Sequence, residues 1–239
     1  MKIIDLSQSL SAEMPVFPQD PDFLINEILN SEKDEFTISV LNTGLHAGTH
    51  LDAPYHFYSS GRKIHEIPLN ELMGPATMIR VENSSRKSSL FSDLGLNTEY
   101  STIKIEASAF KSVKKGNMTV LRTNWSLNWG SDSYFTHNPH LSEKAANFLV
   151  EKEIRGLAID GPSIDKFGET IIHEKLLSND IWIVENLKNL DCIPESKNEE
   201  SNERNTNMTN NNNSLEFFFI PLPLKTEASP IRAFVKINE

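Results

Sequence analysis

The 239-residue sequence predicts a mixed α/β fold, and three observations support this prediction. Short runs rich in β-branched and other apolar residues recur along the chain, and turn signals containing glycine or proline bound several of them. One segment has apolar residues at helical spacing, and a second, shorter segment could form another helix. With 38% hydrophobic residues, the chain can also bury the core that such a fold needs.

Eight runs have the length and composition of β-strands. In chain order they are residues 2–6 (KIIDL), 36–41 (FTISVL), 76–82 (ATMIRVE), 118–123 (MTVLRT), 155–160 (RGLAID), 181–184 (IWIV), 215–224 (LEFFFIPLPL) and 231–237 (IRAFVKI). The run at 76–82 follows the turn signal Gly74-Pro75, and the run at 155–160 ends at Gly161-Pro162.

The clearest helix is predicted over residues 142–153. Ser142 is a suitable N-cap, and Ala145, Phe148 and Leu149 form an apolar stripe at helical spacing, which is typical of core packing. Residues 170–178 are expected to form a second short helix.

Residues 194–214 differ from everything around them, because they are polar, rich in asparagine and glutamate, and lack aromatic residues. Such a stretch cannot bury enough apolar surface to offset its ordering entropy, so we predict a surface loop. The chain beyond it suffices for only two strands, which must complete the sheet begun earlier. The prediction is therefore one domain, residues 1–239, with a polar insertion at 194–214.

Composition narrows the class of protein. The formal net charge of −10 argues against a nucleic-acid partner, which would require a basic surface. No basic amphipathic stretch indicates a membrane surface, and the opening MKIIDLSQ lacks the apolar core of a signal peptide. Cys192 is the single cysteine, so an internal disulfide is impossible. We expect a soluble, cytoplasmic protein.

The stretch HAGTHLDAPYH, residues 46–56, holds three of the seven histidines. A helical pair formed by His46 and His50 is disfavoured by Gly48 and Pro54. A straight strand would place both on one face but ~13 Å apart, whereas ligands of one metal ion lie ~3 Å apart. The chain must therefore bend at residues 47–49 for a metal site to form. The alternative is an ordinary polar turn.

Nucleophilic catalysis is poorly supported. Gly161-Pro162-Ser163 begins like a nucleophile elbow but lacks the closing glycine. Cys192 has no histidine near it in sequence, and a lone intracellular cysteine is usually inert.

The stretch at 46–56 resembles the signature of the cyclase-like metal hydrolases, His-x-Gly-Thr-His-x-Asp-x-Pro-x-His, at every fixed position. Bacterial kynurenine formamidases and isatin hydrolases belong to this family. Further similarities are the opening IIDLSQSLSAEMPVFPQDP and the segments at Arg122–Trp125, Asp160–Asp165, His173 and Glu185. The resemblance thus covers nearly everything except the polar insertion.

The resemblance implies a role for each matching residue. It implies that His46, His50 and Asp52 bind one metal ion, and that Asp52 with His173 and Glu185 binds a second in members that hold two. It further implies a swivelling β/β/α-type fold and a homodimer or larger assembly. Histidine and carboxylate ligands without a thiolate are compatible with zinc, manganese or other divalent ions, and we expect one or two ions of zinc or manganese per chain.

Three more positions have roles implied by the same resemblance. His56 matches the proton-transfer residue. Phe17 occupies the place of a substrate-stacking tryptophan in kynurenine formamidases, and Ser163 is expected to touch the substrate.

Two functions follow as expectations. The first is hydrolysis of a C–N bond in a small amide, either an aryl formamide such as N-formylkynurenine or a cyclic amide. The second is a non-catalytic protein that keeps the fold and binds a metal or small molecule. A proton-transfer residue beside the ligands favours the enzyme, because a binding protein does not need one.

The remaining histidines and tryptophans are expected to be structural. His65 is interpreted as a surface or hinge residue. His137 and His140 are interpreted as loop or cap residues before the helix at 142, with the rim of the active site as the alternative. Trp125 and Trp129 are expected in the core or at an interface, with a pocket wall as the alternative.

Overall fold

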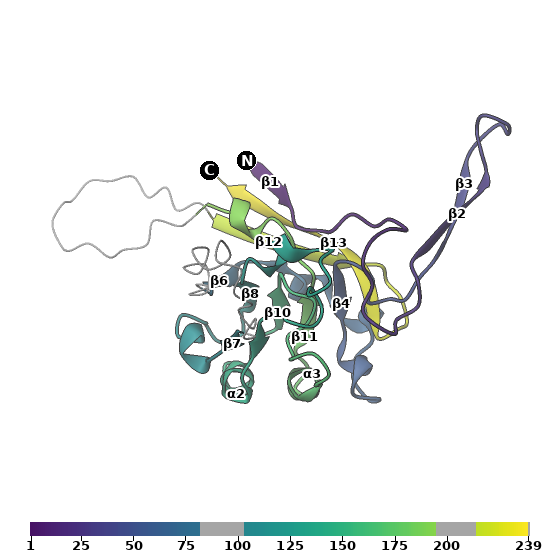
Figure 1. Ribbon diagram of the computed structural model, residues 1–239. Helices are drawn as coiled ribbons and strands as arrows, with labels where there is room; N and C mark the ends of the chain where they lie inside the picture. Colours follow the sequence, from purple (N-terminus) through teal and green to yellow (C-terminus); the bar gives the residue numbers. More distant parts are fainter. Residues whose placement is uncertain (82–102, 195–213, 239) are drawn as a thin grey trace, which may run out of the picture.

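The computed structural model describes residues 1–81, 103–194 and 214–238 (Figure 1). Its centre is a nine-stranded sheet, and this confirms the mixed α/β class. In order of pairing the strands are β5 (Met73–Gly74), β12 (Ser214–Pro221), β13 (Ala228–Asn238), β4 (His50–Asp52), β11 (Trp182–Glu185), β10 (Gly156–Ile159), β8 (Met118–Arg122) and β6 (Ala76–Arg80), and β1 (Lys2–Asp5) also pairs with β13.

The sheet has a parallel part and an antiparallel part. Strands β11, β10, β8 and β6 run parallel, whereas β4, β13, β12, β5 and β1 pair antiparallel. The two parts meet where β4 pairs antiparallel with β11. Only Pro75 separates β5 from β6, which stand at opposite ends of the pairing order, so the sheet closes on itself.

Two α-helices cover one face of the parallel part, as Figure 1 shows. Helix α2 (Glu143–Glu151) begins after Ser142, whose Oγ accepts a hydrogen bond from Ala145 N at 3.1 Å, so the predicted N-cap is confirmed. Helix α3 (Ile171–Leu177) occupies most of the second predicted helix. Short 3-10 helices lie in the connections: η1 (Pro54–His56), η2 (Ile64–Glu66), η3 (Leu69–Glu71), η5 (Ala107–Phe110), η6 (Trp125–Asn128) and η7 (Leu190–Cys192).

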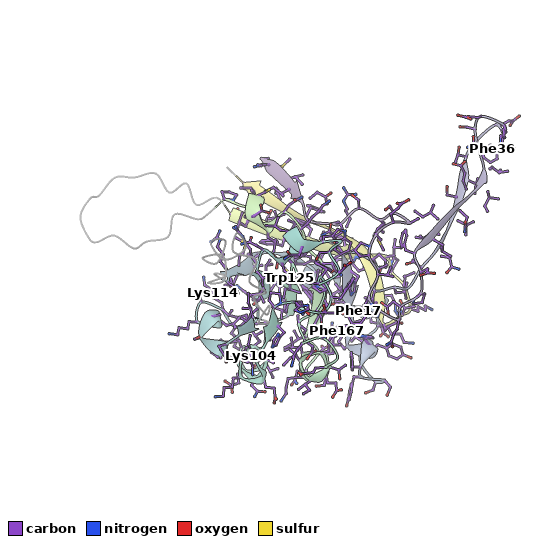
Figure 2. The ribbon with its side chains drawn as sticks, in the orientation of Figure 1. Phe17, Phe36, Lys104, Lys114, Trp125 and Phe167 are labelled. Carbon is purple, nitrogen blue, oxygen red and sulfur yellow. The ribbon has the colours of Figure 1, made fainter. Side chains whose placement is uncertain are left out.

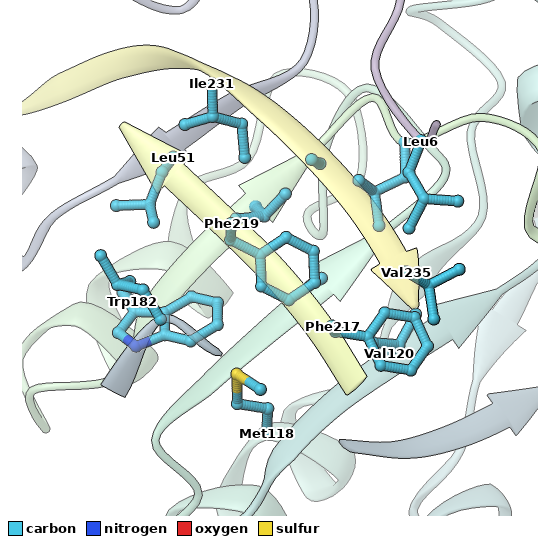
Figure 3. Close-up of a cluster of buried hydrophobic side chains, with 14 of the residues drawn as sticks. Leu6, Leu51, Met118, Val120, Trp182, Phe217, Phe219, Ile231 and Val235 are labelled. Carbon is cyan, nitrogen blue, oxygen red and sulfur yellow. The ribbon is translucent and has the colours of Figure 1, made fainter. Parts of the chain in front are cut away.

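Side chains alternate between two hydrophobic cores on opposite faces of the sheet. Trp182 and Val184 of β11 belong to the core that Figure 3 shows, together with Leu51 and Phe219. Ile183 belongs to the other core, which includes residues of α2 and α3. Glu185 stands two residues after Ile183 on the same strand, so its side chain points to the same face of the sheet, where the helices lie.

Two further pairs of strands lie outside the main sheet. Strands β2 (Leu24–Leu29) and β3 (Ile38–Asn42) form a ribbon that projects away from the body of the molecule (Figure 1). The sequence predicted a strand at 36–41 but not its partner at 24–29. Strands β7 (Lys104–Ile105) and β9 (His140–Leu141) form a short parallel pair.

The C-terminal strands complete the sheet, as the sequence predicts. Strand β13 starts earlier than expected, at Ala228, and passes through Pro230. Glu82, the end of one predicted strand, and the predicted loop at 194–214, apart from Pro194 and Ser214, lie outside the described residues. Among the residues described, no helix combines the length and apolar character needed to cross a membrane.

Candidate metal centre

The chain bends between His46 and His50, as a metal site requires. Gly48 has a φ of +60°, a left-handed conformation that favours glycine. Its carbonyl oxygen accepts hydrogen bonds from His50 Nδ1 and from Asn186 Nδ2, each at 2.9 Å. The bend is therefore held by one hydrogen bond within it and by a second from Asn186, which directly follows β11.

Sheet register brings a residue distant in sequence to the same place. His50 of β4 is directly opposite Glu185 of β11, and Asp52 is opposite Ile183. Helix α3 then supplies His173, whose Nε2 lies 3.2 Å from Glu185 Oε1. The site thus lies on the helix side of the sheet, where its parallel and antiparallel parts meet.

Two groups of three side chains have the spacing to hold a metal ion. His46, His50 and Asp52 form one group, and Asp52, His173 and Glu185 form the other, with ligand atoms within 4.8 Å of one another in each. Asp52 belongs to both groups and turns one oxygen to each. Its Oδ1 lies 2.8 Å from His46 Nδ1 and 3.5 Å from His50 Nε2, and its Oδ2 lies 3.7 Å from His173 Nε2.

The residues present fit a bound cation. Asp52 is 1% exposed, and no N–H or O–H in the described part of the chain is aligned to donate to its Oδ1. A buried carboxylate oxygen without a donor is costly unless a cation satisfies it. His50 Nδ1 donates to Gly48 O, so the Nε2 atom of His50 is available as a metal ligand. His173 Nδ1 donates to Asp165, so the Nε2 atom of His173 is available in the same way.

The electrostatics of the site favour positive charge. Burial lowers the pKa of His46, but the neighbouring carboxylates of Asp52, Glu185 and Asp20 outweigh it and raise that pKa to about 9. Burial also opposes protonation of His173, yet Glu185, Asp165 and Asp52 raise its pKa well above the ordinary value. Protons are thus attracted to the places where a divalent ion would bind, and such an ion would displace them.

His56 lies beside these groups without belonging to either of them. It ends helix η1, and its ring centroid is 4.3 Å from that of His46 and 6.4 Å from that of His173. No carboxylate of the described residues pairs with it within 4.0 Å. Burial, together with the neighbouring histidines, lowers the pKa of His56 to about 4, although Asp52 opposes this effect.

Two supporting residues were not predicted from the sequence. Asp165 accepts from His173 Nδ1 at 2.7 Å and from the backbone N–H groups of Ile172 and His173 at 2.8 and 2.9 Å, so it orients the imidazole. Asn186 accepts from the buried Tyr134 hydroxyl at 2.9 Å and donates to Gly48. Asp165 ends the segment Asp160–Asp165 that carries part of the family resemblance, and Asn186 directly follows Glu185, but the resemblance assigned no role to either residue.

The two groups open into a pocket of about 220 Å³. Phe17 and Ser163, the residues expected to contact substrate, both line it, as do Trp129 and Phe135. The Phe17 ring packs edge-on against Phe135 at 5.5 Å and lies 5.9 Å from the ring of Phe167 (Figure 2). The lining includes no lysine or arginine.

The other residues considered from the sequence lie elsewhere. His65 is exposed on η2, and His140 is buried on β9. Trp125 is 9% exposed, and its Nε1 donates to Tyr134 O at 2.9 Å, as a core aromatic does. Cys192 is exposed on η7. His137, which is partly buried in the turn before β9, is like these absent from the pocket lining.

Comparisons with known proteins agree with this geometry. The kynurenine formamidase of Bacillus anthracis is 28% identical over 245 residues, which cover 98% of this chain and 97% of the relative. The solved structure of isatin hydrolase A from Labrenzia aggregata shares the fold, with a TM-score of 0.77 at 22% identity over 100% of this chain and 94% of that one. A predicted metal-dependent hydrolase from Bacillus stearothermophilus has a TM-score of 0.69 at 26% identity, over 98% and 97% of the two chains.

A sequence model of the Cyclase family matches residues 4–166, which is more than half of the chain. The matched region includes the whole stretch HAGTHLDAPYH and the bend that brings its side chains together. The resemblance inferred from that stretch is therefore confirmed, and the protein belongs to the Cyclase family.

Proposed function

We propose that the protein is a metal-dependent hydrolase that cleaves the C–N bond of a small amide, such as an aryl formamide or a cyclic amide. The observation that carries this proposal is the buried Asp52 carboxylate shared by two groups of metal-binding side chains. The names of the related proteins, kynurenine formamidase and isatin hydrolase, support the same class of reaction.

In this proposal His46, His50 and Asp52 hold one divalent ion, and His173 and Glu185 with Asp52 hold a second. Histidine nitrogens and carboxylate oxygens without a thiolate suit zinc or manganese. When bound, such an ion lowers the pKa of water towards neutrality and polarises the scissile carbonyl. Asp165 keeps the His173 imidazole in the tautomer that leaves its Nε2 free.

His56 is the proposed proton-transfer residue. Its imidazole lies beside both groups of ligands but pairs with no described carboxylate, so its nitrogens remain available to substrate and water. Because burial lowers the pKa of His56 to about 4, its imidazole is neutral at neutral pH, and a neutral imidazole can accept a proton from the attacking water and return it to the departing nitrogen. Without that return, the leaving amine would depart as a poorly stabilised anion.

The pocket walls account for the kind of substrate. Phe17, Trp129 and Phe135 offer aromatic faces and edges to a flat ring near the metal-binding groups. Ser163 supplies a hydroxyl on the same wall and is proposed to contact the substrate. An aryl formamide or a fused cyclic amide has a flat ring next to its scissile bond, which suits such walls.

The finer expectations from the sequence and from the family resemblance belong to this proposal. They are zinc or manganese, one or two ions per chain, a swivelling β/β/α arrangement in a single domain over residues 1–239, a homodimer or larger assembly, and a cytoplasmic location. The strand order and the two covering helices are compatible with the proposed arrangement.

The proposal is tested by assaying the purified protein on N-formylkynurenine and on isatin while its metal content is measured. We expect turnover of at least one substrate, lost on chelation and restored by zinc or manganese. Stoichiometric metal with no hydrolysis of either compound or of simple aryl formamides would favour the non-catalytic binding protein instead.

A further inference from the structure

A hydrogen-bond network connects the aromatic wall of the pocket to the metal-binding groups. Tyr134 Oη donates to Asn186 Oδ1 at 2.9 Å, and Asn186 Nδ2 donates to Gly48 O at 2.9 Å. The same carbonyl accepts a third hydrogen bond, from His50 Nδ1 at 2.9 Å. We call these four residues the network. It joins a tyrosine hydroxyl to a proposed metal ligand that is distant in sequence.

The chemistry of the groups fixes the direction of each hydrogen bond in the network. A carbonyl oxygen can only accept, so Asn186 Nδ2 and His50 Nδ1 are both donors to Gly48. With its amide nitrogen turned to Gly48, Asn186 presents its amide oxygen to Tyr134, so the phenol is the donor there. A proton held on His50 Nδ1 leaves Nε2 without one, and this is the form of histidine that binds a metal ion.

The network is buried, so water does not replace a hydrogen bond that is lost. Tyr134 is fully buried and Asn186 is 4% exposed. The backbone of Asn186 is also engaged, since its N–H donates to Gly161 O at 2.8 Å and its carbonyl accepts from Thr49 Oγ1 at 2.7 Å. Burial raises the pKa of Tyr134 well above its ordinary value, so the hydroxyl keeps the proton that it donates.

Asparagine suits position 186 for two reasons. Its backbone has a φ of +61°, a left-handed conformation that asparagine adopts more readily than most residues other than glycine. Its side chain must also accept from one partner and donate to another, which an amide does and a carboxylate does not. An aspartate at this position would turn a carboxylate oxygen toward Gly48 O, where two acceptors repel each other.

The other end of the network lies between two residues of the aromatic wall. The Tyr134 ring packs edge-on against Trp129 and against Phe135, each at 5.1 Å between ring centroids. Trp129 and Phe135 line the pocket, whereas Tyr134 stands behind them. The hydroxyl that begins the network is therefore held in place by the rings that are proposed to face the substrate.

Gly48 is the point at which the network can act on the metal-binding group. It stands in the bend before β4, outside the regular hydrogen bonds of the sheet, and side-chain donors hold its carbonyl instead. The orientation of the His50 imidazole depends on that carbonyl, because it accepts from Nδ1 and so sets the direction of Nε2.

We propose that Tyr134 and Asn186 are positioning residues, which act through the Gly48 carbonyl to orient His50 as a metal ligand. This inference rests on the proposed function, because it assigns both residues a role toward the ion that His50 would hold. It also means that the aromatic wall and the metal-binding group are aligned by one set of hydrogen bonds.

The first test measures the Kd of the apo protein for zinc by competition with a chromogenic chelator. Loss of an orienting partner typically lowers metal affinity about 10–100-fold. We expect a fall of about 10-fold in Tyr134→Phe, which removes only the hydroxyl, and of up to about 100-fold in Asn186→Asp. Tyr58→Phe is the matched control, because Tyr58 is 51% exposed and lies outside the pocket lining, and it should keep the wild-type Kd.

A second control separates positioning from a purely structural role. Both network variants leave a buried polar atom without its partner and should lose some stability. Val235→Ala should also lose stability, because Val235 is fully buried in the core of Figure 3, but it lies outside the pocket lining. A domain of ordinary stability stays almost entirely folded after such a loss, so Val235→Ala should keep the wild-type Kd for zinc. If Tyr134→Phe also keeps it, the positioning role is wrong.

The second test loads the protein with cobalt(II), whose visible absorption spectrum reports the geometry of its ligands. We expect a changed spectrum in Tyr134→Phe and an unchanged one in Tyr58→Phe and Val235→Ala. Because Tyr134 acts only through Asn186, the double variant Tyr134→Phe/Asn186→Asp should bind cobalt no more weakly than Asn186→Asp. Additive losses would overturn the proposal. Should Asn186→Asp fail to fold, the zinc Kd and cobalt spectrum of Tyr134→Phe decide alone.

The outcomes also separate this inference from the proposed function. A wild type that binds neither zinc nor cobalt would overturn both. A wild type that binds metal, with the same Kd and the same cobalt spectrum in Tyr134→Phe, would overturn the positioning role alone.

Discussion

His50 and Glu185 face each other across β4 and β11, and His50 Nε2 lies 3.6 Å from Glu185 Oε2. In the described strand order, this antiparallel pairing joins the antiparallel part of the sheet to its parallel part. The register of a buried pair of strands is strongly fixed, because a slip of one residue would turn every side chain to the other face. His50, Asp52 and Glu185 are therefore positioned by the sheet, whereas His46 stands in the bend before β4.

Replacing His50 with alanine is expected to lower metal content and activity together. Zinc or manganese should stabilise the wild type by about 2.7 kcal/mol at a concentration one hundred times its Kd, and this gain should largely disappear in the variant. Elemental analysis after dialysis and melting temperatures with and without metal measure the two effects. His65→Ala is the control, since His65 is exposed on η2, and it should behave like the wild type.

His56→Ala should keep its metal and lose most of its turnover. General acid–base groups contribute about 10²–10⁴-fold, which sets the expected fall in kcat. The comparison of metal content and kcat with His50→Ala separates the two roles. If His56→Ala releases metal as completely as His50→Ala, then His56 is a ligand and the proposed division of roles is wrong.

Asp165→Asn should weaken metal binding without removing a ligand. The carboxylate accepts three hydrogen bonds in the structure, two of them from His173, and an amide offers a single oxygen for the same donors. Loss of such an orienting partner typically costs 10–100-fold in metal affinity. Competition with a chromogenic chelator gives the Kd, and an unchanged value would show that α3 alone orients His173.

Asp160 should make the stability of the protein depend on pH. Burial raises its pKa from 3.8 to about 6, even though Thr123 and Asn124 donate hydrogen bonds to the carboxylate. Between these two values the folded state binds more protons than the unfolded state, so this group stabilises the fold at low pH and loses that contribution as pH rises through about 6.

This rise in the pKa of Asp160 corresponds to at most about 3 kcal/mol in the free energy of unfolding. The measurement is urea unfolding of the wild type and Asp160→Asn at neutral and mildly acidic pH. The free energy of unfolding of the wild type relative to the variant should increase on acidification, and a constant difference would contradict the prediction.

Gly156→Ala should destabilise the fold. A Cβ at this position would overlap the indole ring of Trp182, which is fully buried and belongs to the core that Figure 3 shows. Overpacking of this kind costs about 1–3 kcal/mol. Gly161→Ala is a suitable comparison, because a Cβ there meets its nearest neighbour, Ile159 Cδ1, at an ordinary 3.7 Å. Thermal or urea unfolding of the two variants measures the difference.

Much of the candidate site was predictable because its first part is local in sequence. His46, His50 and Asp52 lie within seven residues, and Gly48 showed where the chain could bend. His173 and Glu185 were identified by family resemblance, since spacing alone does not distinguish a lone helical histidine from a structural one. Asp165 and Asn186 were missed, because hydrogen bonds to partners that folding brings together define their roles.

In the fold, too, the elements with local sequence signals were predicted and those without them were missed. Helix α2 was predicted from its cap and its apolar spacing, both of which are local signals. The strand at 24–29 was missed because the run LINEIL does not alternate between polar and apolar residues, and the ribbon it joins has no buried face in this chain. Pro230 hid the start of β13, since proline lacks the N–H that a strand usually donates.

The position of β4 between β11 and β13 has a consequence for how the protein is made. Asp52 and its register partner Ala228 are separated by most of the chain. At a translation rate of about 5–20 residues per second, the ribosome needs roughly 10–35 s to pass from one to the other. During that time the histidine-rich stretch has emerged without the strands that hold it in place. Metal loading should therefore follow chain completion, and nascent chains should leave the ribosome in the apo form.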